Sequence, residues 1–410
     1  MLLPTPFHER VAAANSTSLW SHWAGHLVVD KYQMSEKWEY VALRNAAGIF
    51  DTSPLYKYRI TGREAERFLA GVLTRDIRSC EPGEAQYTIW CDDRGFVNED
   101  GVIFRYGVDD FLLTAAEPNL AYLLDLANSY DVEIDDVSRT YAMLAVQGPR
   151  SAVILGSLAP EIAGLGFFCH TRGRINGVDV TISRTGFTGD LGYEVIMAAD
   201  DAVLVWDAIV EAGEPYGLTL FGQHALLMAR IEAGLLLLDV DFEPSRFAEN
   251  DEHRSTPLEL GLGWMLHGID DDSRPFIGRH AILRERADET SRWKMMGLIV
   301  DWEEYEQRFT QANLLPPKNH IPIHDTMMVY DENAGQVGYA TSFMYSPILQ
   351  KHIALARIRP DLAVLDARVD LEFTVNHHYR KIGAHVVRTP FFDPALKTAN
   401  SAQSLPGEPS

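Results

Sequence analysis

Apolar and polar residues alternate in several short segments of the first third of the chain. This alternation predicts strands at residues 56–60, 87–91, 96–104 and 111–114. Residues 92–95 contain two aspartates and a glycine, which is typical of a hairpin turn. At residues 64–73 and 119–129 the apolar residues have helical spacing instead, which predicts two helices. Strands and helices mixed in this order indicate an α+β domain.

A second group of strands surrounds a glycine-rich loop. Strands are expected at residues 178–183 and 193–197, and the loop between them carries Gly186, Gly189 and Gly192, three residues apart. Glycine permits positive φ angles and lets a ligand approach the backbone closely. Glu194 follows one residue inside the second strand, which would hold a ligand-binding carboxylate firmly. An ordinary glycine-rich hairpin with a surface glutamate is the alternative.

The pattern changes after residue 293, where short strands and turns replace the mixed pattern. The expected strands are residues 296–300, 321–330, 335–341, 353–358, 370–374 and 384–387. Such spacing with little helix predicts a separate β-barrel or sandwich. Residues 395–410 are small and polar, and we expect a disordered tail there.

Composition and charge narrow the possible partners. The 410 residues include 36 Lys and Arg against 58 Asp and Glu, a formal net charge of −22. The negative electrostatic field of such a chain repels nucleic acid and anionic membranes, which are therefore disfavoured as partners. The chain begins without a secretory signal pattern and has no apolar run long enough to span a bilayer, so a cytoplasmic protein is expected. Three widely spaced cysteines, and His22 and His26 without further ligands, predict neither a disulfide framework nor a metal site.

Seven sequence blocks, in order, resemble the glycine-cleavage T-protein (aminomethyltransferase) superfamily, which transfers one-carbon units to tetrahydrofolate. The blocks are GIFDTS at 48–53, YT at 87–88 with GFVNED at 95–100, QGP at 147–149, TGFTGDLGYE at 185–194, RIEAG at 230–234, TPLE through Trp264 at 256–264, and VGYATS through Pro347 at 337–347. The resemblance runs from about residue 48 to residue 390. It implies three domains, two interleaved α+β domains and a C-terminal β-barrel.

The resemblance also implies domain boundaries. Residues 1–56 and 141–238 would form a folate-binding α+β domain, residues 57–140 and 239–289 a second α+β domain, and residues 290–394 the barrel.

The resemblance assigns the site residues. Glu194 matches the family's pterin-binding carboxylate, which can accept from a ring N–H and the adjacent amino group together. Tyr87 and Phe187 match aromatic positions that line the folate site, and Phe187 replaces the family's tyrosine. Arg230 is the arginine kept from the family's longer motif, and the resemblance assigns it to cofactor binding. Asp100 aligns with the catalytic aspartate, and the hairpin places it on the strand next to Tyr87.

Departures from the T-protein pattern direct the functional prediction. Leu226 stands where the T-protein has an arginine, and Ser53, Pro54 and Leu55 replace its SHM block. A net charge of −22 also suits an acidic carrier protein poorly. These differences, with the aromatic segment before residue 45, predict a tetrahydrofolate-dependent demethylase that moves a methyl group from a small O-, N- or S-methylated donor to tetrahydrofolate.

Other functions of the same superfamily stay open. They are an aminomethyltransferase of the glycine-cleavage type and a non-catalytic folate-binding protein. The folate domain of a flavin amine oxidase is disfavoured, because no GxGxxG fingerprint follows a first strand.

Overall fold

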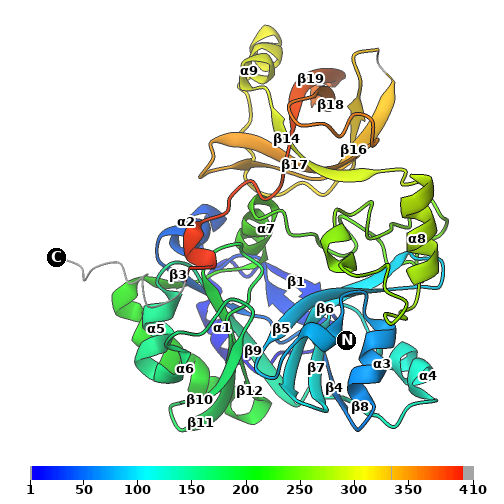
Figure 1. Cartoon of the computed structure of the whole chain (residues 1–410). Helices are drawn as coiled ribbons and strands as arrows, with labels where there is room; N and C mark the ends of the chain where they lie inside the picture. The colour runs from blue at the N-terminus through cyan, green and yellow to red at the C-terminus, as the bar shows by residue number, and fades with distance from the viewer. Residues whose placement is uncertain (1, 334, 400–410) are drawn as a thin grey trace. The chain divides into compact units, whose positions relative to one another are not determined.

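The computed structural model describes residues 2–333 and 335–399. Contacts divide the chain into two units. Figure 1 labels the helices and strands of the chain. Of the described residues, unit 1 comprises 2–89, 99–226 and 393–399, and unit 2 comprises 90–98, 227–333 and 335–392. The chain therefore crosses between the units at both strands of one hairpin, within one helix and near its C-terminus.

Unit 1 contains a six-stranded sheet in the order β10-β11-β12-β9-β3-β13. Its strands are β3 (Ala47–Asp51), β9 (Tyr141–Gln147), β10 (His170–Ile175), β11 (Val178–Ser183), β12 (Gly192–Ala198) and β13 (Leu218–Leu220). All neighbours are antiparallel except β13, which runs parallel to β3. The turn from β10 to β11 is the expected Asn176-Gly177 pair, and both residues have positive φ.

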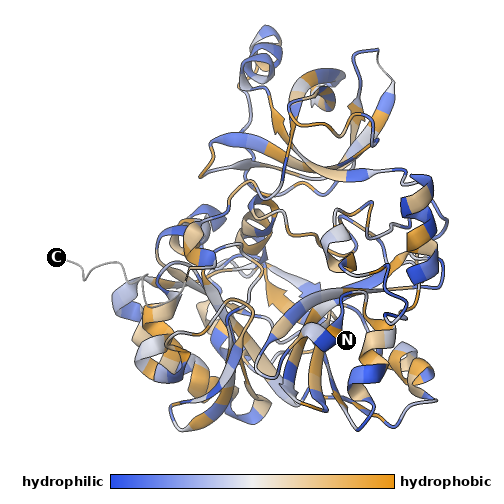
Figure 2. Ribbon diagram, viewed as in Figure 1, coloured by the Kyte–Doolittle hydropathy of each residue, from blue (hydrophilic) through white to orange (hydrophobic). Residues whose placement is uncertain are grey.

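One face of this sheet packs against two helices, α5 (Ser151–Leu158) and α6 (Ala202–Gly213). Strand residues such as Val195 meet Val205 and Trp206 of α6 in a single buried cluster. Figure 2 shows both helices largely in hydrophobic colours. Tyr193 and Val195 belong to this core. Because side chains alternate along a strand, Glu194 between them lies on the opposite face of β12.

The second sheet has the order β5-β6-β7-β4-β8. Its strands are β4 (Tyr56–Thr61), β5 (Ala85–Cys91), β6 (Val97–Gly107), β7 (Asp110–Ala115) and β8 (Glu133–Asp136), and its helices are α3 (Ala65–Val72) and α4 (Leu120–Ala127). These bounds confirm the strand–helix order expected for this region. The ends of β5 and β6 that meet at the turn belong to unit 2.

The two sheets of unit 1 share a small core. Ala85 of β5, Phe104 of β6 and Leu112 of β7 form one buried cluster with Met143 of β9 and Ile196 of β12. The cluster therefore joins the face of β12 that carries Glu194 to a face of the five-stranded sheet.

The N-terminal segment folds onto unit 1. It forms α1 (His8–Ala14), a hairpin of β1 (Trp20–Trp23) and β2 (His26–Val29), and α2 (Glu36–Asn45). Phe7 lies 5.4 Å from Trp206 of α6, measured between ring centroids, and joins the helix-side core. The aromatic residues of this segment are thus partly structural. Trp38, by contrast, is exposed.

Unit 2 contains a closed barrel in the order β14-β17-β16-β15-β18-β19. The strands are β14 (Lys294–Val300), β15 (Met327–Tyr330), β16 (Gln336–Ser346), β17 (Lys351–Ile358), β18 (Arg368–Val375) and β19 (His378–Val387). The helices are α7 (Gln223–Glu232), which begins in unit 1, α8 (Arg279–Asp288) and α9 (Trp302–Gln311). Short 3-10 helices in the two units are Ile77–Ser79, Pro160–Ile162, Ala199–Asp201, Glu214–Tyr216, Gly263–Leu266 and Ala395–Lys397.

Two strands are longer than expected, β16 at its end and β19 at its start, and the barrel differs from the expectation in two further places. Helix α9 interrupts a region expected to contain only strands, and Asp301 caps it by accepting a hydrogen bond from the backbone N–H of Glu304 at 3.0 Å. The strand expected at 321–330 is limited to Met327–Tyr330, preceded by a single bridge at Ile323. Pro322 cannot donate a backbone hydrogen bond to a ladder.

The mixed α and β architecture with a C-terminal six-stranded barrel confirms the predicted fold class. The detailed three-domain boundaries stay a prediction. Of the tail expected at 395–410, residues 395–397 form a 3-10 turn, and residues 400–410 lie outside the described residues. Within the described chain, none of the helices is long and apolar enough to cross a membrane.

Candidate active site

Tyr87 and Asp100 form the centre of the candidate site. The hydroxyl of Tyr87 on β5 donates a hydrogen bond of 2.7 Å to Oδ2 of Asp100 on β6. Both side chains are partly buried. The alternating pattern and the turn at 92–95 place the two residues on adjacent strands, as the sequence predicted.

Burial raises the pKa of Asp100 to about 6, although the Tyr87 hydrogen bond opposes this effect. A carboxyl group with a pKa near neutrality is suited to accepting and returning a proton. Its neighbour Glu99 points away, into a buried network with Asn119 and the backbone N–H of Glu117. Burial and the charge of Asp100 raise the pKa of Glu99 to about 9, so Glu99 is uncharged at neutral pH.

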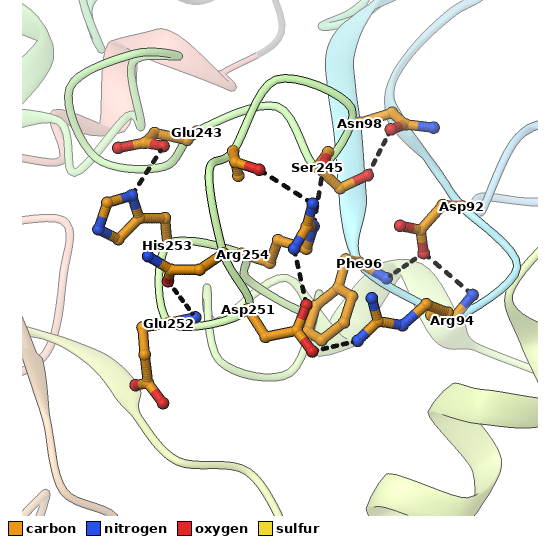
Figure 3. Close-up of polar contacts among 12 residues, drawn as sticks. Asp92, Arg94, Phe96, Asn98, Glu243, Ser245, Asp251, Glu252, His253 and Arg254 are labelled. Atoms are coloured by element: carbon orange, nitrogen blue, oxygen red, sulfur yellow. Dashed lines mark hydrogen bonds and ion pairs between the residues drawn. The ribbon is translucent and has the colours of Figure 1, made fainter.

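The turn between β5 and β6 is held by contacts within unit 2. Oδ1 of Asp92 accepts the backbone N–H groups of Arg94 and Phe96, at 3.0 and 2.9 Å (Figure 3). Arg94 pairs with Asp251, which also accepts a hydrogen bond from Arg254 at 2.7 Å. The tight turn and its ion pairs define the connection from which β6 runs toward Asp100.

The glycine-rich loop is built around the amide of Gln147 at the end of β9. Its Nε2 donates to the carbonyl oxygens of Thr185 and Tyr193, at 3.2 and 3.1 Å, and its Oε1 accepts from Thr188 at 2.9 Å. A Cβ added at Gly186 or Gly192 would lie 2.0 or 2.2 Å from this amide. Two of the three glycines therefore make room for Gln147.

A buried ion pair stabilises residues 188–190 of the same loop. Nη1 of Arg44 on α2 donates to the carbonyl oxygen of Thr188 at 2.9 Å and lies 3.5 Å from Oδ2 of Asp190. Gly189, between them, has φ of 73° and is the glycine that serves a left-handed turn. Neither Arg44 nor Gln147 was expected as a support of the loop. Gln147 stood within a family block, but its role depends on packing between distant segments.

Glu194 lies in a row of side chains on one face of the six-stranded sheet. Its cross-strand neighbours are Ser183 on β11 and Ala145 on β9, and Phe50 on β3 is the next residue in the row. The side chain is 8% exposed, and Thr185 donates a hydrogen bond to its Oε2. Burial raises the pKa of Glu194, and the Thr185 hydrogen bond lowers it.

Strand alternation relates these residues to the shared cluster between the two sheets. Glu194 is two residues from Ile196 on β12, and Tyr87 is two residues from Ala85 on β5. Residues two apart on a strand share a face. The faces that carry Tyr87 and Glu194 are therefore the two that pack against each other. Phe187, in the loop, is partly buried.

Arg230 belongs to unit 2 and is fully buried there. Its guanidinium donates to Oδ2 of Asp241 at 2.5 Å and to the hydroxyl of Ser342 at 2.7 Å. Asp241 also accepts hydrogen bonds from Thr341 and Ser342, next to a bulge of β16. The basic side chain and two residues of the 337–347 block thus meet in one polar cluster.

Among the described residues, no group of three or more His, Cys, Asp or Glu side chains could hold a metal ion. The three cysteines at positions 80, 91 and 169 are free.

Sequence comparison relates this architecture to known proteins. Residues 7–268 match the GCVT N-terminal domain, and residues 310–393 match the glycine cleavage T-protein C-terminal barrel domain. The chain belongs to the glycine cleavage T-protein family. The aminomethyltransferase of Caldanaerobacter subterraneus is 33% identical over 339 residues, which cover 81% of this chain and 82% of the relative. That of Bacillus subtilis is 32% identical and covers 87% of this chain and 91% of the relative.

A solved structure has the same fold. The glycine cleavage system aminomethyltransferase T from Bartonella henselae matches with a TM-score of 0.80 at 22% identity, covering 96% of this chain and 99% of that one.

The demethylase prediction is wrong. Relatives at about 32% identity over most of the chain are named aminomethyltransferase, which favours the glycine-cleavage alternative. The prediction relied on a few departures, such as Leu226, and on the total charge. A net charge of −22 does not describe the local surface that a partner meets, so it is a weak guide to carrier recognition.

Proposed function

We propose that this protein is an aminomethyltransferase of the glycine-cleavage type, with tetrahydrofolate as the one-carbon acceptor. The observation that carries the proposal is the similarity to aminomethyltransferases along more than 80% of both chains. The donor would be an aminomethyl group held on the lipoyl arm of a carrier protein. Its bond to sulfur would break and leave the reduced thiol on the arm, and ammonia would be the second released product. Tetrahydrofolate supplies the amine that accepts the one-carbon unit.

The buried carboxylate of Glu194 fits a pterin. Among the described residues only Thr185 hydrogen-bonds this group, and it uses Oε2. Oε1 therefore has its lone pairs available for a ligand N–H, and a charge-assisted hydrogen bond in a buried setting is strong and directional. Phe187 and Tyr87 are the proposed aromatic contacts.

Asp100 is the proposed catalytic residue. Its hydrogen bond with Tyr87 orients the carboxylate, and a pKa of about 6 leaves it ionised at neutral pH. In this state it can accept a proton from the acceptor amine and stabilise positive charge that develops nearby. Glu99, uncharged beside it, adds no repulsion.

The test is an assay of both products. Purified protein is mixed with tetrahydrofolate and an aminomethylated lipoyl carrier, and 5,10-methylene-tetrahydrofolate and ammonia are measured together. We expect the two products in equal amounts. Absence of both, with folate bound normally, would contradict the proposal and favour a non-catalytic folate-binding protein.

Asp100→Asn is the matched variant, because it keeps the shape of the side chain and removes the proton acceptor. We expect kcat to fall about 10²–10⁴-fold with little change in folate affinity. Normal turnover by this variant would remove Asp100 from the mechanism.

A further inference from the structure

A pair of buried hydroxyl groups lies directly behind Glu194. Ser183, the last residue of β11, is the cross-strand neighbour of Glu194 and is fully buried. Thr185, two residues later, is 3% exposed. The hydroxyl of Ser183 lies 2.5 Å from that of Thr185, which in turn hydrogen-bonds Oε2 of Glu194. The three groups form one short chain of hydrogen bonds.

The direction of this chain follows from proton counting. A hydroxyl group has one proton to donate. Thr185 donates its proton to Glu194, so Ser183 must donate to Thr185. Each bond in such a chain polarises the next and strengthens it. Both donations therefore favour the ionised carboxylate and fix which oxygen faces the hydroxyl groups.

The backbone around Thr185 is also fixed. Its carbonyl oxygen accepts a hydrogen bond from Gln147 at 3.2 Å, and Gln147 is bonded at the same time to Tyr193, the residue before Glu194. One side chain thus ties both ends of the glycine-rich loop. Thr185 cannot leave Glu194 without disturbing this connection, which makes its hydroxyl a preorganised partner.

We propose that Thr185 and Ser183 are positioning residues for folate recognition: they hold Glu194 through one lone pair of Oε2, so that Oε1 and the remaining lone pair of Oε2 are presented to a planar pair of N–H donors such as the ring N–H and amino group of a pterin. The inference rests on the proposed function, because it takes folate as the ligand. Neither residue needs to touch the ligand itself.

Other charged groups near the loop have partners of their own. The guanidinium of Arg184 donates to the carbonyl oxygens of Leu165 and Ala399, and Asp190 pairs with Arg44. The cross-strand neighbours of Glu194 on β9 and β11 carry no charge. Thr185 is accordingly the side chain that offsets the effect of burial on Glu194, and the pKa of Glu194 should rise further without it.

Thr185→Val tests the proposal, because valine keeps the branched shape and removes the hydroxyl. Tetrahydrofolate affinity is measured by calorimetry at one fixed pH in the wild type, Thr185→Val and Thr185→Ser. We expect Thr185→Val to bind about tenfold more weakly than the wild type, because Glu194 loses the hydrogen bond that holds its Oε2. Thr185→Ser should bind within about threefold of the wild type. Thr171→Val, on the same sheet, is the control and should bind normally.

A double-mutant cycle separates positioning from general loop damage. Glu194→Gln removes the group that Thr185 is proposed to hold, so Thr185→Val should cause no further loss in that background. A loss that is equal in Thr185→Ser, or fully additive to that of Glu194→Gln, would overturn the inference while leaving the proposed function intact. A wild-type protein that does not bind tetrahydrofolate would instead overturn both.

Discussion

Replacing Tyr87 with phenylalanine tests the electrostatics of the candidate site directly. The change keeps the ring and removes the hydroxyl that donates to Asp100 at 2.7 Å. Burial raises the pKa of Asp100 to about 6, and this hydrogen bond is the main effect that opposes burial. Its removal should therefore move the pKa upward.

The size of the shift follows from the strength of the bond. A hydrogen bond to a charged group contributes about 1.5–3 kcal/mol. Because one pKa unit corresponds to 1.36 kcal/mol, the pKa of Asp100 should rise by about 1–2 units, to about 7–8. The ionised form of Asp100 would then be a minority at neutral pH. Glu99, with a pKa of about 9, is still mostly protonated at pH 7–8 and titrates above the expected pKa of Asp100.

The measurement is kcat/KM for one-carbon transfer to tetrahydrofolate between pH 5 and 9. At the acidic end of the profile, kcat/KM falls as the essential base of the free enzyme becomes protonated. The midpoint of this acidic limb should lie near pH 6 in the wild type and about 1–2 units higher in Tyr87→Phe. The activity of the variant should approach that of the wild type at pH 9. Asp100→Asn should lack the limb altogether. A limb that stays in place or moves to lower pH would refute the reasoning.

Three further predictions concern stability and are measured by urea unfolding. Gly192→Ala should cost about 1–3 kcal/mol through its clash with the buried amide behind the loop, whereas Gly156→Ala, in helix α5 with no contact closer than 4.0 Å, should be neutral or stabilise by up to about 1 kcal/mol; equal effects would contradict the packing argument. Burial lowers the pKa of His352 from 6.5 to about 4, so the unfolded state binds a proton first and the wild type loses stability as the pH falls below 6.5. Between pH 8 and 5, His352→Phe should lose about 2 kcal/mol less of its free energy of unfolding than the wild type. An equal loss in both proteins would contradict this. Deleting residues 393–410 removes carbonyl partners of the buried Arg184 guanidinium and should cost at least about 2 kcal/mol, so unchanged stability would contradict its anchoring role.

The hairpin that carries Tyr87 and Asp100 was predictable because its determinants are local. Alternating residues define the two strands, and the aspartates and glycine at 92–95 define the turn. The barrel was predictable for the same reason. Helix α9 was missed because only Tyr305 and Phe309 of its residues are buried, so its apolar stripe is weak among neighbouring strands. Its capping aspartate was the available signal.

The support of the loop was not predictable, because it depends on residues far apart in sequence. The spacing of Gly186 and Gly192 suggested room for a ligand, yet both positions are filled by Gln147, some 40 residues earlier. Likewise Arg230 was expected only as a folate contact, and its pairing with Asp241 and Ser342 depends on a bulge in a distant strand. Motifs give residue types, while packing decides what each one touches.

The register of β12 links the core of unit 1 to its proposed chemistry. Val195 enters the helix-side core, so Glu194 must lie on the other face, and a slip of one residue would exchange the two. Gly192 pairs with Gln147 across the strands, and the Gln147 amide donates to the carbonyl oxygen of Tyr193. This contact, which only a glycine at position 192 permits, opposes such a slip. The glycine-rich loop therefore serves ligand binding indirectly: it lets Gln147 fix the register of β12, the strand that carries Glu194.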